Sequence, residues 1–166
     1  MAMTQEQYWK ELYQLKAHIN YVEILYENAD QIDRTLKIIL AVAASTSIGA
    51  WVIWKNYAWV WASVIAFSQV ITAINPFLPY KERIKDYGSL LHELEEILIQ
   101  AEFKWHSIAE GELTEPEINQ ARFEIRSQKL KSLKKHITGT TIPRDEKARR
   151  RAEDSAREYF ETFYPG

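Results

Sequence analysis

The chain has 166 residues, a formal net charge of −2 and no cysteine. Its length fits one domain, or a core with extensions. Without cysteine, a disulfide framework, a thiolate nucleophile and a Cys-based zinc site are excluded.

The N-terminal region, residues 1–34, predicts an amphipathic helix. Its apolar side chains recur at alternating steps of four and three, as in helices that pack against one another. They are Tyr8, Leu12, Leu15, Ile19, Val22, Tyr26 and Ala29. The region is polar and acid-rich and lacks a basic start followed by an apolar stretch, so we expect no cleaved signal peptide.

The middle of the chain differs sharply in composition from its flanks. From Ile38 to Tyr80 the sole charged side chain is Lys55. Two apolar runs, at about 35–54 and 58–78, each match a helix that crosses a hydrocarbon core of about 30 Å. The sequence therefore predicts a two-helix transmembrane hairpin within residues 35–80. The alternative is a pair of buried core helices, each apolar on nearly every face.

Basic residues flank this hairpin and indicate its orientation. Arg34 and Lys37 precede it, and Lys81, Arg83 and Lys85 follow it. Because cytoplasmic flanks carry an excess of lysine and arginine, we expect a multi-pass protein with both termini in the cytoplasm.

Small and polar residues form stripes inside the two apolar runs. They are Ala41, Ser45, Gly49, Gln69, Thr72 and Asn75. Such stripes let helices approach closely and hydrogen-bond across an interface. Two interpretations stay open: packing within the hairpin, or self-association around a polar path lined by Ser45, Gln69, Thr72 and Asn75.

Pro76 and Pro79 interrupt the second run near its end. Each removes a backbone donor and disfavours helix at the preceding residue. The segment is either a hinge or an ordinary helix end.

Residues 81–166 predict further helices. The four-and-three rhythm returns at Ile84, Tyr87, Leu91, Leu94, Leu98, Ala101, Trp105 and Ile108, and we expect this seam to face that of the N-terminal helix. Gly111 is expected to close the long helix, and Thr114 and Glu117 have the spacing of a capping box. We expect a helix over about Glu115 to Ile137 and a last helix from Asp145. The fold class is thus all-α, a transmembrane hairpin that continues into a cytoplasmic antiparallel stalk or bundle.

The strongest local net charge lies between Asn119 and Arg151, a stretch that contains eleven basic residues and three acidic ones. The basic patch comprises Arg122, Arg126, Lys129, Lys131, Lys134, Lys135, Arg149, Arg150 and Arg151. It can hold anionic lipid headgroups or a nucleotide, with direct nucleic-acid binding the least expected. The alternative is a solvated face balanced by acids elsewhere in the fold.

Catalytic motifs are absent from the sequence. A His-Glu-x-x-His pair, glycine-rich phosphate loops and a Gly-x-Ser-x-Gly elbow do not occur. The histidines stand at 18, 92, 106 and 136, and His92 is expected to be an exposed helix residue. We expect no enzyme, no metal site and no cofactor.

Several segments together resemble the SLATT family, two-transmembrane effectors of bacterial anti-phage defence. They are Arg34 through Arg83, with the Trp54-Lys55-Asn56-Tyr57 turn, the Asn75-Pro76 break and the Tyr80-Lys81-Glu82-Arg83 exit, and then Ile142-Pro143-Arg144 and Tyr164-Pro165. The resemblance implies an effector in the bacterial inner membrane that oligomerises, forms a pore or disrupts the membrane, and causes growth arrest or cell death.

It also implies three kinds of partner: the lipid bilayer, further copies of the chain, and a sensor or nucleotide-second-messenger protein. The competing hypothesis is a non-toxic membrane anchor or scaffold that recruits a partner through its cytoplasmic helical bundle.

Overall fold

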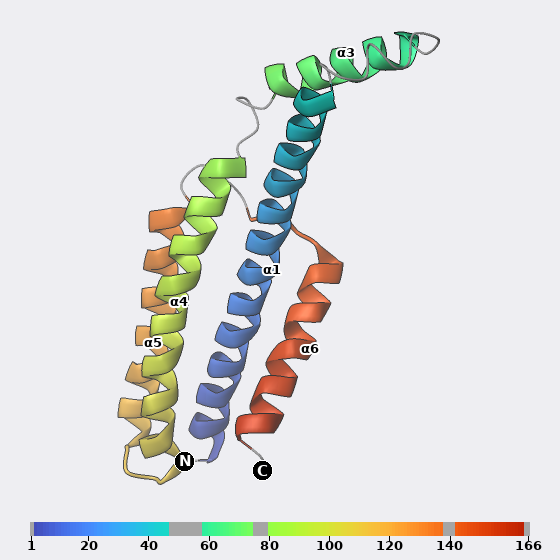
Figure 1. The fold of residues 1–166 in the computed structure, drawn as a ribbon. Coiled ribbons are helices and arrows are strands. Elements are labelled where there is room, and N and C mark those ends of the chain that lie inside the picture. Colours follow the sequence, from blue (N-terminus) through green and yellow to red (C-terminus); the bar gives the residue numbers. More distant parts are fainter. Residues whose placement is uncertain (1, 47–57, 75–79, 138–141, 165–166) are drawn as a thin grey trace. The chain divides into compact units, whose positions relative to one another are not determined.

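The computed structural model describes residues 2–46, 58–74, 80–137 and 142–164, and its regular structure within these ranges is helical. In chain order the helices are α1 (Ala2–Thr46), α3 (Ala58–Ile74), α4 (Tyr80–Ala109), α5 (Glu115–His136) and α6 (Glu146–Phe163) (Figure 1). The predicted all-α class is therefore confirmed for these ranges. The chain divides into two compact units. Unit 1 consists of Met1–Tyr26 and Lys85–Gly166, and unit 2 of Glu27–Ile84.

Unit 1 is a four-helix bundle built from the first part of α1 with α4, α5 and α6 (Figure 1). The predicted seams of α1 and α4 do meet in one core, which α5 and α6 complete. Its buried members are Tyr8, Leu12, Leu15, Ile19, Val22, Leu25, Tyr87, Leu90, Leu94, Ile97, Leu98, Ala101, Ile108, Ile118, Ala121, Ile125 and Phe160. Burial of each leucine, isoleucine, valine or phenylalanine side chain among them stabilises the bundle by roughly 1.5–3 kcal/mol.

Local sequence signals set the helix ends of unit 1. Gly111 has φ 75°, the left-handed conformation that glycine adopts without strain, and it closes α4. The backbone N–H of Thr114 donates to Glu117 Oε2 at 2.8 Å, so the predicted capping box starts α5. Asp145 Oδ1 accepts from the backbone N–H of Lys147 at 2.9 Å and caps α6.

Helix α6 packs on the bundle through a narrow alanine face and an aromatic end. The alanines at 148, 152 and 156 are buried. At the other end, the ring of Trp9 on α1 lies 4.9 Å from that of Phe160 and 5.5 Å from that of Tyr164, centroid to centroid. These edge-to-face pairs add about 0.5–1.5 kcal/mol each beyond the area that they bury.

Unit 2 corrects the prediction of a membrane hairpin. Among the described parts of the chain, no helix is both long and apolar enough to cross a membrane. In α1 the long uncharged run begins after Lys37. The first half of α1 contributes its apolar side chains to the core of unit 1. The prediction of a multi-pass protein of the bacterial inner membrane with both termini cytoplasmic is therefore wrong.

Candidate functional site

The nine residues of the basic patch lie on two helices. Arg122, Arg126, Lys129, Lys131, Lys134 and Lys135 belong to α5, and Arg149, Arg150 and Arg151 belong to α6. Helix α5 pairs with α1 and α4 through Arg126–Glu11 and Lys104–Glu124, whereas α6 bonds to α1 and α4 through Tyr13–Glu153 and Tyr159–Glu102, and α6 lies on the other side of α1 from α5 (Figure 1). The structure therefore divides the patch between two faces of the bundle.

Three cations of α5 hold this helix to its neighbours. The Arg126 guanidinium pairs with Glu11 Oε2 at 2.6 Å, and the Glu11 carboxylate is nearly buried. Arg122 Nη1 donates to Gln7 Oε1 at 2.5 Å. Lys135 pairs with Glu93 on α4, and hydrogen bonds from Lys135 and His136 lower the pKa of Glu93 to about 2. Each of these cations therefore has a partner on α1 or α4.

His18 on α1 and Lys129 on α5 are two further basic side chains of this interface, and burial shifts the pKa of each. Burial, and then the nearby positive charge of Lys129, lower the pKa of His18 to about 4. Burial also lowers the pKa of Lys129, although Glu11 acts in the opposite direction. His18 Nε2 is buried and has no hydrogen-bond partner in the described ranges. His18 is thus a neutral imidazole at pH 7 with one unsatisfied nitrogen.

A cleft of about 830 Å³ lies between α1 and the start of α6, and we call it the α1–α6 cleft. Tyr13, His18 and Tyr21 line it from α1, and Arg144, Arg149 and Arg157 line it from α6 and the segment before it. Its volume falls within the range of about 300–1,000 Å³ typical of small-molecule sites.

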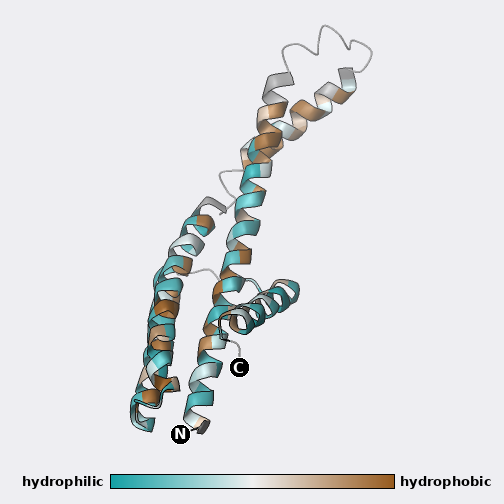
Figure 2. Ribbon diagram, turned by 60° about the horizontal axis from the view of Figure 1, so that its bottom comes forward, coloured by the Kyte–Doolittle hydropathy of each residue, from teal (hydrophilic) through white to brown (hydrophobic). Residues whose placement is uncertain are grey.

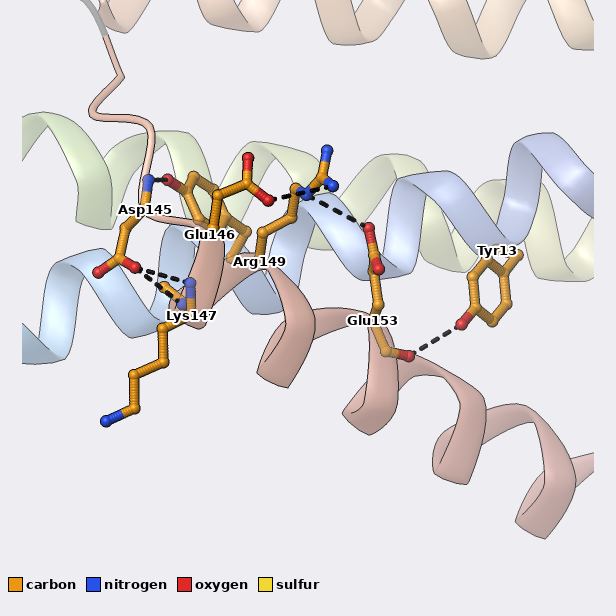
Figure 3. Close-up of polar contacts among 8 residues, drawn as sticks. Tyr13, Asp145, Glu146, Lys147, Arg149 and Glu153 are labelled. Carbon is orange, nitrogen blue, oxygen red and sulfur yellow. Dashed lines mark hydrogen bonds and ion pairs between the residues drawn. The ribbon is translucent and has the colours of Figure 1, made fainter.

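Hydrogen bonds to the main chain position the walls of the α1–α6 cleft. The Tyr13 hydroxyl donates to the carbonyl oxygen of Glu153 at 2.8 Å (Figure 3). The Tyr21 hydroxyl donates to the carbonyl of Pro143 and accepts from the backbone N–H of Asp145 at 3.0 Å. The two tyrosines therefore tie α1 to α6 and to the segment that leads into it.

A smaller groove of about 360 Å³ runs between α4 and α5. Phe103 and Leu113 contribute apolar surface to it, and Lys104 and Glu124 pair across it at 3.1 Å. Three more apolar side chains on these two helices are exposed, namely Ile99, Phe123 and Leu130.

The predicted stripe of small and polar residues is only partly covered by the structure. Ala41 and Ser45 lie on α1, and Gln69 and Thr72 lie on α3, three residues apart and both exposed. Gly49, Asn75 and the predicted hinge prolines Pro76 and Pro79 lie outside the described residues.

Metal ligands do not gather in the described ranges, where no group of three or more His, Asp or Glu side chains could hold an ion. Comparison with family models, with curated proteins and with solved structures finds no match to the chain.

The sequence alone does not reveal the α1–α6 cleft, because its walls are more than a hundred residues apart in the chain. One signal was present in the sequence. Tyr13, Ala17 and Tyr21 recur every four residues on α1, beside the seam that faces α4. This spacing indicates a second contact face, but it does not say which helix covers it.

Proposed function

We propose that the chain is a self-assembling effector, in which copies associate through the apolar surface of unit 2 and the assembled form is active. One observation carries this proposal, the exposure of large apolar side chains in unit 2. On α3 they are Trp59, Val60, Val64, Ile65, Phe67, Val70 and Ile74, and on α1 they are Ile32, Ile38, Ile39 and Val42. Together these residues define the unit 2 apolar surface.

Helix α3 carries no charged residue, and apolar residues predominate along it among a few polar ones (Figure 2). Trp59 is 71% exposed, and Ile65, about 120° further around the helix, is 42% exposed. A large exposed apolar patch marks an interaction site. Contact with further copies would remove this surface from water.

The polar groups of α3 are compatible with an interface between copies that excludes water. Ser63 Oγ donates to the carbonyl oxygen of Trp59 at 2.9 Å, and Thr72 Oγ1 donates to that of Ser68 at 2.8 Å. These hydroxyls therefore need no water when the helix is covered. Gln69 is exposed, and its amide offers donors and an acceptor for hydrogen bonds between copies.

We expect assembly to arrest growth because the resemblance to the SLATT family implies it. The pore lined by Ser45, Gln69, Thr72 and Asn75 is not carried forward, because it required two membrane spans. What remains is an effector whose activity depends on contact between copies.

Induced expression in a bacterium tests the effector proposal. We expect the wild-type chain to arrest growth, and Phe67→Asp to abolish the arrest, because a carboxylate on the unit 2 apolar surface opposes its burial. Phe103→Asp is the matched control, since Phe103 is 82% exposed on α4 of unit 1. Normal growth with accumulated wild-type protein, or arrest by Phe67→Asp, would contradict the proposal.

A second candidate function is a scaffold that recruits a partner protein through unit 1. The groove between α4 and α5 favours it, because apolar side chains such as Phe103 and Phe123 are exposed beside a preformed channel. An amphipathic helix of a partner can lay its apolar face in such a groove. A photoreactive amino acid at position 103 should then crosslink to one partner, and the same group at position 150 should not.

A further inference from the structure

The two halves of α5 are attached to unit 1 in different ways. Its members of the buried core lie in the first half and are Ile118, Ala121 and Ile125. In the second half, residues 129–136, Leu133 is partly buried against this core, and none of these described residues belongs to it. We call residues 129–136 the α5 arm.

We propose that the α5 arm is an acid-sensitive element, which lies against α1 at neutral pH and detaches when His18 takes up a proton. Detachment would give the buried Nε2 atom of His18 access to water. This inference concerns unit 1 and is independent of self-association through unit 2.

The contact between α1 and α5 has more cations than carboxylates. The Glu11 carboxylate of α1 pairs with the Arg126 guanidinium at 2.6 Å. Lys129 lies near both groups, since burial and Arg126 lower its pKa while Glu11 acts in the opposite direction. One carboxylate thus serves two cations of α5, and a further positive charge at this contact would meet repulsion from Lys129.

His18 is the side chain on which this further charge would arise. It lies on α1 near Lys129, and its Nε2 atom is buried with no hydrogen-bond partner in the described ranges. Burial, and then Lys129, lower the pKa of His18 from 6.5 to about 4. Detachment of the α5 arm would remove both effects, because it exposes the imidazole to water and separates it from Lys129.

The groups on the other side of His18 do not supply the missing negative charge. The charged residues that line the α1–α6 cleft with it are three basic and three acidic ones, namely Arg144, Arg149, Arg157, Asp145, Glu146 and Glu153. Asp145 caps α6, and Glu146 and Glu153 lie 3.2 and 3.7 Å from guanidinium nitrogens of Arg149 (Figure 3). Of the charged groups in the described ranges, Lys129 is the one that shifts the pKa of His18.

The attachment of the α5 arm to α4 responds to a lower pH. Lys135 and His136 bond to the Glu93 carboxylate, and these bonds lower its pKa from 4.5 to about 2. This contribution to stability is therefore present above pH 4.5 and is lost as the pH falls toward 2. Between pH 7 and pH 5 it changes little, so a pH response of the arm in that window reports on His18.

The size of the response follows from the two pKa values of His18. With the arm attached the pKa is about 4, and with the arm detached it returns toward 6.5. The fraction of molecules with a detached arm should then rise at most about twentyfold between pH 7 and pH 5. About two turns of helix are not stable alone, so the detached arm should unwind and its amide hydrogens should exchange with solvent.

Hydrogen exchange of the full-length chain, measured by mass spectrometry at pH 7 and pH 5, tests the proposal. After correction for the intrinsic effect of pH on exchange, the protection of residues 129–136 should fall by up to about twentyfold in the wild type. The fall should be absent in His18→Gln and smaller in Lys129→Gln. His106→Gln is the matched control and should behave as the wild type, because His106 is exposed on α4.

Low concentrations of urea distinguish detachment of the arm from unfolding of the whole bundle. Detachment exposes little surface, so exchange in residues 129–136 should depend weakly on urea, whereas exchange of the core amides of α4 should depend on it strongly.

Three results would overturn the proposal: no pH response of residues 129–136 in the wild type, a response that His18→Gln leaves intact, or exchange of these residues that follows urea as steeply as that of the core. Circular dichroism on each variant establishes that the helical bundle is intact.

Discussion

Protonation of His18 should make the stability of the protein depend on pH between 7 and 5. Its pKa lies at about 4 in the folded chain, against an ordinary value of 6.5, chiefly because the side chain is buried. As the pH falls below 6.5, the unfolded chain therefore takes up a proton that the folded chain does not. The free energy of unfolding falls with it.

The magnitude follows from these two pKa values. Between pH 7 and pH 5 the difference in proton uptake corresponds to a loss of at most about 2 kcal/mol. This loss of unfolding free energy is an upper bound, because the His18 side chain keeps some contact with solvent. Above pH 7 both states hold a neutral imidazole, so the loss is absent there.

Urea unfolding followed by circular dichroism, in buffers free of phosphate, measures this dependence. His18→Gln should flatten the profile by about 2 kcal/mol between pH 7 and pH 5. His92→Gln is the control, because His92 is exposed on α4. A His18→Gln profile as steep as that of the wild type would refute the reasoning.

Four further substitutions test the packing and the helix ends of unit 1 by the same unfolding assay. A Cβ atom at Gly88 would lie 3.4 Å from the ring of Tyr26, an ordinary contact, so Gly88→Ala should raise stability by up to about 1 kcal/mol through helix propensity; a loss would show that the contact is too tight. Gly111→Ala should cost about 1 kcal/mol, because φ is 75° there, and an unchanged value would argue against this helix end. Glu11→Gln should cost about 1–3 kcal/mol by removing the partner of Arg126. In the Glu11→Gln background, Arg126→Gln should then cost little, and full additivity would contradict the pairing.

The helices of unit 1 could be predicted from the sequence because their signals are local. The four-and-three spacing of α1 and α4 gives the buried seam, and Gly111 and the Thr114–Glu117 pair give the helix ends. Each signal depends on residues within a few turns of one another, which a sequence displays directly.

The basic patch could not be predicted in its final form, because a charge run does not reveal which side chains face a neighbouring helix. Arg126 turns to Glu11, 115 residues earlier, and Arg122 turns to Gln7. The membrane prediction failed for a related reason. It counted apolar residues, and no helix within the described ranges is long and apolar enough to cross a membrane.

Sedimentation equilibrium of the purified chain tests the central claim most directly, namely association through the unit 2 apolar surface. The wild type and Phe103→Asp should each have a mass that is a multiple of the 19.5 kDa chain, and Phe67→Asp should sediment as the single chain. A wild-type mass of one chain, or a Phe67→Asp mass equal to that of the wild-type assembly, would contradict the claim.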